Sequence, residues 1–256
     1  MTSIEFLTPS APRTFDDEAA WYEEASVTHF WFRWRMDAIS RMLSRHGVPW
    51  DVPLRSLDVG CGTGVLIRQI QSRSHWEIDG ADLNQDALER VRCDPGRVLF
   101  YDIEQRDPRL KDSYDVIFLC DVIEHVPDPR ALLGAALWHL RPGGILLINV
   151  PALQRFHGAY DDAVGHLRRY DGPSLRTDIE GAGGIVIDTT YWGFLMLPML
   201  VARWAAFRSD EVSIRRGLTP PNRGVEAVLN LARRCERAVG SRFPLGTSIL
   251  ALASRS

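Results

Sequence analysis

Residues 56–64 read SLDVGCGTG, and this short stretch decides the expected fold. It places three glycines, at positions 60, 62 and 64, directly after an apolar run that reads as a buried strand. Glycine at the end of a strand lets a ligand press on the backbone, because a Cβ would collide with it. The dinucleotide fingerprint G-x-G-x-x-G needs its third glycine at 65, where this chain has Val65. Asp58 would also repel a pyrophosphate, and it suits a ligand that carries an ammonium or sulfonium group.

The pattern around the glycine turn predicts a doubly wound α/β fold. Expected strands at 54–59, 76–82, 97–101, 114–119 and 144–150 are joined by helices at 64–73, 84–92 and 129–140. Stretches such as YDVIFLC (114–120) are continuously apolar, which is typical of parallel strands buried on both faces. Helices between such strands form the crossovers of a parallel sheet. A helix at 173–182 and strands at 183–191 and 247–254 are expected to complete the fold.

Composition and charge set limits on the class of protein. The chain has 256 residues, 45% of them hydrophobic and 25% charged, as in an ordinary globular domain. A net charge of −3 gives no electrostatic reason to expect nucleic acid as a partner. The four cysteines show no CxxC or zinc spacing, which favours reduced thiols in a cytoplasmic protein. The start of the chain lacks the features of a signal peptide. The apolar stretch 192–207 is short for a membrane span, which leaves a buried helix or one lying on a membrane.

Two further carboxylates follow the next expected strands. Asp82 ends the second strand, where an acid accepts hydrogen bonds from ribose hydroxyls. Asp102 ends the third strand, within reach of an adenine amino group. One carboxylate facing a cation, one a ribose and one a base together describe S-adenosylmethionine rather than a nucleotide.

Residues 54–150 closely resemble the class I S-adenosylmethionine-dependent methyltransferases. The resemblance rests on LDVGCGTG, GADLN, YDVIFLCDVIEHVPDP and LRPGGILLINVP, in the family's order. It implies a seven-stranded, mostly parallel Rossmann-like sheet with an antiparallel last strand. It also implies that the cofactor contacts are Asp58, Gly60, Cys61, Gly62, Gly64, Asp82, Leu83, Asp102, Ile103, Cys120 and Asp121.

We expect a single methyltransferase domain, 1–256, with four parts. An N-terminal helix at 17–46 is expected to cap the cofactor-binding core 54–150. A loop and helix at 151–182 face the methyl acceptor, and a helical insertion at 193–240 separates the last two strands. The aromatic cluster HFWFRWR (29–35) favours an apolar or planar acceptor, although such a helix often only packs on the sheet.

The stretch CDVIEHVPDP (120–129) places Asp121, Glu124 and His125 after the fourth strand of the core. It resembles the metal-binding ExxEH of small-RNA 2′-O-methyltransferases and some ubiquinone-pathway O-methyltransferases, with Asp121 in place of the first glutamate. This implies a possible Mg²⁺ site at Asp121, Glu124 and His125. The alternatives are His125 as a general base and a turn that only orients the loop.

The loop at 149–171 carries more functional groups than a connection needs. In one interpretation His166 is a base or an extra metal ligand, and Tyr170 shapes the acceptor pocket. Arg168 or Arg169 would then hold an anionic group of the acceptor. In the other, the arginines form a solvated turn and His166 caps the next helix.

These expectations together describe a methyltransferase that acts on a small-molecule or lipid-linked acceptor, at oxygen by preference. Methylation at carbon or nitrogen is the alternative within the same class. A protein of this fold can also bind S-adenosylmethionine without transferring a methyl group, as a cyclase or a partner subunit. Nucleic-acid modification is disfavoured because the (N/D)PPY motif is missing. A homodimer and contact with a membrane surface stay open.

Overall fold

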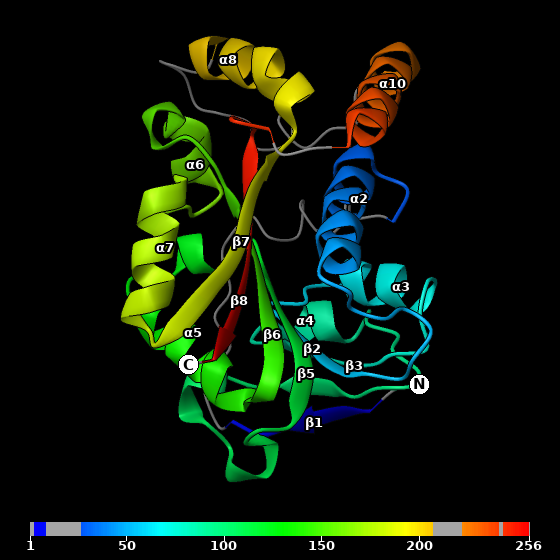
Figure 1. The fold of residues 1–256 in the computed structure, drawn as a ribbon, viewed down its shortest axis with the longest axis vertical. Helices are drawn as coiled ribbons and strands as arrows, with labels where there is room; N and C mark the ends of the chain where they lie inside the picture. The colour runs from blue at the N-terminus through cyan, green and yellow to red at the C-terminus, as the bar shows by residue number, and fades with distance from the viewer. Residues whose placement is uncertain (1–2, 9–26, 207–221, 241–242, 256) are drawn as a thin grey trace.

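The computed structural model describes residues 3–8, 27–206, 222–240 and 243–255. These residues form one eight-stranded sheet in the order β1-β4-β3-β2-β5-β6-β8-β7, covered by helices on both faces (Figure 1). The strands are β1 (Ile4–Phe6), β2 (Arg55–Val59), β3 (Glu77–Asp82), β4 (Val98–Phe100), β5 (Tyr114–Cys120), β6 (Leu140–Pro151), β7 (Gly184–Trp192) and β8 (Ser248–Arg255). The helices are α2 (Phe30–Arg45), α3 (Val65–Gln71), α4 (Gln85–Leu88), α5 (Pro129–His139), α6 (Ala159–Ala163), α7 (Gly172–Gly181), α8 (Leu197–Ala206) and α10 (Arg223–Val239).

The direction of the strands confirms the expected fold class. All neighbours from β1 to β6 are parallel, and β8 runs antiparallel to both β6 and β7. The strand order reverses between β2 and β5, which lie side by side with Asp58 opposite Phe118. Ligands bind at such a switch point, outside the carboxyl ends of the strands. The glycine turn after β2 and the DVIEH stretch after β5 therefore meet at one place.

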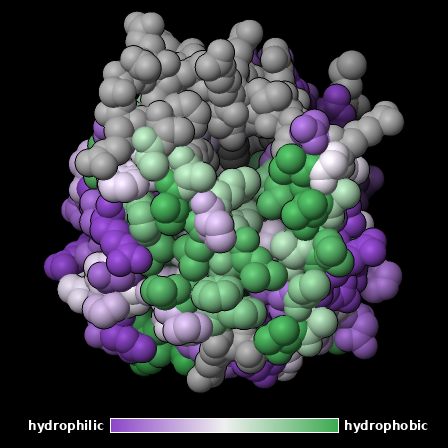
Figure 2. Space-filling model, turned by 90° about the horizontal axis from the view of Figure 1, so that it is seen from above, coloured by the Kyte–Doolittle hydropathy of each residue, from purple (hydrophilic) through white to green (hydrophobic). Residues whose placement is uncertain are grey.

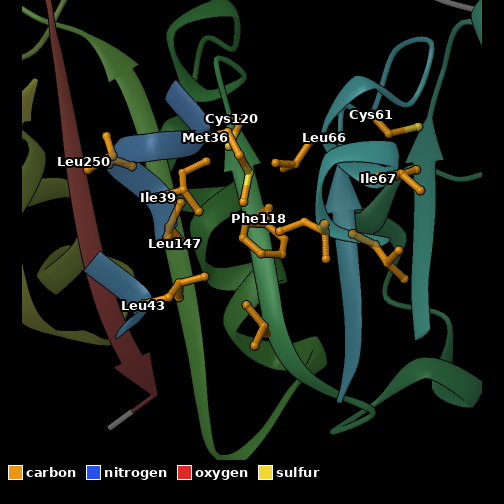
Figure 3. Close-up of a cluster of buried hydrophobic side chains, with 14 of the residues drawn as sticks. Met36, Ile39, Leu43, Cys61, Leu66, Ile67, Phe118, Cys120, Leu147 and Leu250 are labelled. Carbon is orange, nitrogen blue, oxygen red and sulfur yellow. The ribbon is translucent and has the colours of Figure 1, made fainter. Parts of the chain in front are cut away.

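Burial on both faces explains why β5 is continuously apolar. Val116, Phe118 and Cys120 point into a core shared with α2, α3 and α4 (Figure 3). Ile117 and Leu119 point into a second core beneath α5 and α7. Successive residues of a strand face opposite sides of the sheet, so β5 contributes apolar side chains to both cores. The helices pack against these two apolar layers.

Several details differ from the expectations. The sheet has eight strands rather than seven, since β1 adds a parallel edge strand against β4. Three residues, IEF, are too short to show a pattern. The helix expected at 84–92 is only α4, because the sequence Asp94-Pro95-Gly96 returns the chain to β4 before a longer helix can form. Within the described part of the expected helix 17–46, α2 begins at Phe30, and residues 17–26 lie outside the described residues.

The insertion between the last two strands contains η5 (Phe194–Met196), α8 and α10 in its described residues. None of the helices in the described parts of the chain is long and apolar enough to cross a membrane. Figure 1 shows α8 and α10 together at one end of the molecule, with α10 beyond the start of α2.

Buried polar contacts fix α10 to the rest of the fold. The Glu236 carboxylate accepts hydrogen bonds from Trp34 Nε1 at 2.9 Å, from the Gly193 backbone N–H at 2.8 Å and from the Leu195 N–H at 3.4 Å. Arg233 of α10 forms an ion pair with Asp37 of α2. A buried carboxylate is tolerated only when such donors surround it. Glu236 thus connects α10, α2 and the turn after β7.

We expect Trp34→Phe to lower the free energy of unfolding by about 2 kcal/mol or more, because Glu236 loses a donor and a buried ring loses volume. Chemical denaturation measures this loss. Trp50→Phe is the matched control: its indole N–H donates to Ser44 Oγ at the surface, where water can replace the hydroxyl. Equal destabilisation by the two substitutions would contradict a special role for Glu236.

Candidate functional site

The glycine turn after β2 has a backbone conformation that favours glycine. Gly60, Gly62 and Gly64 all have positive φ angles, of 69°, 52° and 75°. A Cβ built on Gly60 would lie 2.7 Å from Val122 Cγ2, so a side chain cannot be added there without a clash. Gly64 is the N-cap of α3, which directs the first N–H groups of that helix at the turn. The turn is therefore a bare backbone cradle at the switch point.

Asp58 lies at the base of this cradle, 2% exposed. Burial raises the pKa of its carboxyl to about 7, although the nearby Arg35 guanidinium lowers it and Asp82 raises it further. A cation placed beside Asp58 would favour the ionised form. The residue is thus suited to an ammonium group, as its place in the sequence predicts.

Asp82 is held rigidly at the end of β3. Its Oδ2 accepts a hydrogen bond from the Gly62 N–H at 2.7 Å, and its Oδ1 accepts from the N–H groups of Leu83 and Asn84 at 2.7 and 2.9 Å. Burial raises the pKa of Asp82, and these three backbone donors oppose the rise. A carboxylate has about four lone-pair sites, so it can still accept from a ligand hydroxyl.

The remaining expected cofactor residues border the same edge of the sheet. Asp102 follows β4, and its side chain caps η1 (Ile103–Gln105) by accepting from the Glu104 N–H at 3.1 Å. Ile103 is buried, and Leu83 is half-buried. Cys61 and Cys120 are buried free thiols, and burial raises the pKa of both. They offer apolar sulfur surface rather than nucleophiles at neutral pH.

Asp121 is engaged in an ion pair that the sequence did not reveal. Its Oδ2 accepts from Arg35 Nη1 at 2.8 Å and its Oδ1 from Asn149 Nδ2 at 2.8 Å. Asn149 Oδ1 accepts in turn from Trp192 Nε1 at 2.8 Å. The φ angle of Asp121 is 60°, a left-handed conformation that turns the chain out of β5. The chain of contacts joins α2, β5, β6 and β7.

The residues that lie close enough to share a metal ion differ from the expected Asp121, Glu124 and His125. The ligand atoms of Glu124, His125 and His166 lie within 4.8 Å of one another, whereas Asp121 does not belong to the group. Both carboxylate oxygens of Glu124 are buried and lack a hydrogen-bond partner among the described residues. Burial raises the pKa of Glu124, and the neighbouring Asp121 adds to the rise. Burial and His166 lower the pKa of His125 to about 4, which keeps its ring neutral.

The loop after β6 orients His166 toward Glu124. His166 Nδ1 lies 2.9 Å from Asp161 Oδ1, and its Nε2 lies 4.0 Å from Glu124 Oε1. Asp161 is itself paired with Arg169 at 2.8 Å. Burial acts to raise the pKa of Asp161, but His166 and Arg169 outweigh it and lower the pKa to about 2. An ionised Asp161 therefore fixes which ring nitrogen of His166 faces the site.

Arg168, Arg169 and Tyr170 all have contacts within the protein. Arg169 is buried against Asp161 and donates to the Ala152 carbonyl at 3.1 Å, so its charge is already used. Arg168 donates to the Pro127 carbonyl at 3.1 Å. The Tyr170 ring packs in the core beneath α7, and its backbone pairs with Ala152. Whether Tyr170 shapes an acceptor pocket stays a prediction.

Aromatic rings of α2 and β7 lie beside the site. Trp31 is half-buried, with its ring centroid 5.7 Å from that of Trp192 and 5.2 Å from that of Phe32. The Arg35 guanidinium carbon lies 5.0 Å from the Trp31 ring centroid. Arg35 and Asn149 are the site residues that the sequence pattern missed. Arg35 belongs to the aromatic cluster at 29–35, where the sequence pattern indicated only a polar position on a helix face. No sequence signal indicated Asn149 except that it lies near the end of an expected strand.

The fold is a Rossmann-like α/β fold with a mostly parallel sheet. The glycine cradle and the two carboxylates at adjacent strand ends are typical of the class I methyltransferases. A sequence model of the methyltransferase domain family matches residues 23–187, and the chain belongs to that family. Its members in class I use S-adenosylmethionine as cofactor, and the residues of the cradle fit it.

Comparison with known proteins agrees with this assignment. A ubiquinone biosynthesis O-methyltransferase of Neisseria meningitidis serogroup A / serotype 4A is 32% identical over 102 residues, which are 37% of this chain and 43% of that protein. The chain thus spans less than half the length of this curated relative. Two solved structures share the fold: the 1,6-didemethyltoxoflavin-N1-methyltransferase of Burkholderia thailandensis and the cyclase SpnF. The first has a TM-score of 0.54, 16% identity and coverage of 94% of this chain and 83% of that one. The second has a TM-score of 0.56, 17% identity and coverage of 86% and 81%.

The pKa of Asp58 predicts a pH dependence of cofactor binding. Because that pKa is raised to about 7, the carboxyl must lose a proton before it can pair with a ligand ammonium. We expect the affinity for S-adenosylhomocysteine to rise about tenfold between pH 6 and pH 8, with proton release on binding. Calorimetry in two buffers of different ionisation enthalpy measures both quantities. In Asp58→Asn the affinity should be weak and independent of pH, and an unchanged pH profile in that variant would contradict the assignment.

Proposed function

We propose that the protein transfers the methyl group of S-adenosylmethionine to a hydroxyl oxygen of a small, lipid-linked acceptor with a planar ring. The observation that carries this proposal is the meeting of Asp58 and Asp82 with the Glu124–His125–His166 trio at one switch point. The carboxylates suit the cofactor, and the trio offers groups that can act on a hydroxyl proton. The names of the matching relatives support oxygen as the acceptor atom.

The residues divide the cofactor between them in this proposal. S-adenosylmethionine supplies an electrophilic methyl group on a positively charged sulfur. Asp58 pairs with the ammonium of its amino-acid end and Asp82 with its ribose hydroxyls. Arg35 pairs with its carboxylate, because Arg35 Nε is buried near Asp58 without a hydrogen-bond partner among the described residues. Asp102 and Ile103 contact the adenine.

The acceptor then approaches from the side of α2. Trp31, which packs against the buried Trp192, provides flat apolar surface for a ring. Alignment of the hydroxyl with the methyl group supplies much of the rate. The hydroxyl must lose its proton, which is the role of the trio. Asp161 holds His166 in the tautomer whose Nε2 faces Glu124, and Arg169 keeps Asp161 ionised.

The trio also fits a divalent cation. One buried carboxylate and two imidazoles on one side of a site form the set that binds Zn²⁺, Mn²⁺ or Fe²⁺, whereas Mg²⁺ prefers oxygen ligands. The unpartnered oxygens of Glu124 and the hydrogen bond that holds His166 Nδ1 agree with such a site. A cation held there would lower the pKa of an acceptor hydroxyl. Asp121 does not belong to this group, and its oxygens accept from Arg35 and Asn149 instead.

A carbon or nitrogen acceptor and a non-transferase role are less well supported. The match to the cyclase SpnF, at 17% identity, concerns the fold alone. A cytoplasmic location and a homodimer stay predictions.

Transfer is tested with methyl-labelled S-adenosylmethionine, using simple catechols, a short-chain isoprenylated catechol and a fractionated lysate as acceptors. We expect labelled product in the organic-soluble fraction and an equal amount of S-adenosylhomocysteine. Asp58→Asn should reduce turnover at least about tenfold at subsaturating cofactor, since it removes a charge-assisted contact. Bound cofactor without any S-adenosylhomocysteine formed would contradict methyl transfer. Label on carbon or nitrogen would contradict the choice of oxygen.

The cation is tested by chelation and metal analysis. We expect a chelator to reduce turnover at least about tenfold and Mn²⁺ or Zn²⁺ to restore it better than Mg²⁺. Glu124→Gln keeps the side-chain volume and should abolish metal binding while leaving S-adenosylhomocysteine binding intact. Asp162→Asn, an exposed acid of the same loop, is the control. Turnover that resists the chelator would overturn the cation and leave His166 as the general base.

A further inference from the structure

The outer face of α10 has the reverse of the usual pattern for a surface helix. Its inward row contains Leu229, Arg233 and Glu236, of which the two charged residues are 7% and 1% exposed. Its outward side carries Val225, Val228, Leu231 and Val239, which are 42%, 65%, 61% and 66% exposed. A helix covered only by water places apolar residues inward and charges outward. The exposed side of α10 is therefore built to be covered.

The apolar surface continues onto neighbouring elements. Exposed hydrophobic side chains there are Phe194, Leu195, Met199, Val201 and Leu245. Figure 2, which looks onto this end of the molecule, shows hydrophobic residues gathered across its middle and hydrophilic residues along both sides. An apolar patch spread over several elements and bordered by polar residues marks an interaction surface.

Charge indicates what covers this surface. Arg234 and Arg237 are exposed on α10 beside the apolar side chains, and Arg237 Nη1 also lies 3.9 Å from Asp37 Oδ1. Of the two acids of α10, Glu236 is buried and bonded, which leaves Glu226 near the start of the helix. An apolar stripe flanked by arginine is the composition of helices that lie in the interface of an anionic bilayer. A second copy of the same basic surface would bring like charges together.

We propose that the outward face of α10, with η5 and α8 beside it, docks on the surface of an anionic lipid bilayer. The position of this face suits a lipid-linked acceptor, and in this respect the inference rests on the proposed function. Glu236 bonds both Trp34, next to Arg35 on α2, and Gly193, next to Trp192. Glu236 thus connects the docking face to the acceptor side of the site, and in this proposal a lipid-linked acceptor reaches the site from the bilayer.

The test is flotation of the protein with vesicles of phosphatidylcholine, with and without phosphatidylglycerol. We expect binding that is stronger to the anionic vesicles and weakened by salt. Val228→Asp and Leu231→Asp should each reduce the partition coefficient at least about tenfold. Arg234→Gln should reduce binding to the anionic vesicles only. The control is Val52→Asp, which changes a valine that is 47% exposed in the loop before β2 and should bind as the wild type does.

The variants are checked for folding by thermal unfolding and by S-adenosylhomocysteine binding, both of which should be unchanged. Wild-type protein that floats with neither vesicle overturns the proposal, as does full binding by Val228→Asp and Leu231→Asp. A wild-type dimer that Val228→Asp converts to a monomer assigns the face to a second copy instead of lipid.

Methyl transfer to a water-soluble catechol without vesicles separates this inference from the proposed function. Val228→Asp should leave that rate unchanged and slow only transfer to a vesicle-bound acceptor. Vesicle binding without any methyl transfer would refute the proposed function and keep the docking surface. Transfer to the soluble catechol without vesicle binding would do the opposite.

Discussion

The ion pair between Arg35 and Asp121 is the contact on which the site depends. It joins α2, which precedes the sheet in sequence, to the end of β5 at the switch point. Asn149 and Trp192 extend it to β6 and β7. Removing two charges from water is costly, and the cost is offset only when the geometry is good and the remaining lone pairs are satisfied. The pair therefore fixes the position of α2 over the cofactor cradle more than it adds to the free energy of unfolding.

The same ion pair separates Asp121 from the cluster of Glu124, His125 and His166. Asp121 is paired with Arg35, whereas the carboxylate oxygens of Glu124 have no hydrogen-bond partner among the described residues. The neighbours of Glu124 are His125, one residue on, and His166, which comes from the loop after β6 and is oriented by Asp161. Several polar residues of that loop hold His166 in place. Arg169 neutralises Asp161, and Asp161 holds His166, so the loop supports its own functional group.

The fold and the cofactor side were predictable because they depend on local patterns. Apolar runs, glycines and acids at strand ends identified β2, β3 and β5 and placed Asp58 and Asp82 correctly at adjacent strand ends. The edge strand β1 was missed because three residues carry no periodicity, and its pairing with β4 is long-range. Arg35, Asn149 and the position of His166 beside Glu124 were not predictable for a related reason. Each depends on a contact between distant segments, and no residue type or spacing in one segment reports its partner in another.

The electrostatics of the switch point give the site its selectivity. Burial raises the pKa of Asp58, Asp82, Asp121 and Glu124, so four carboxyls at one edge of the sheet are costly to ionise together. Arg35 lowers the pKa of Asp58 and Asp121 and contributes in the same direction at Glu124. A positively charged ligand would also lower the cost of ionising these acids, because the attraction between opposite charges is stronger where water is excluded. An anionic phosphate would add to the repulsion at the same place. The cradle thus shares the bare glycine backbone of a nucleotide site, while the acidic side chains beside it favour a cationic sulfonium cofactor over an anionic phosphate.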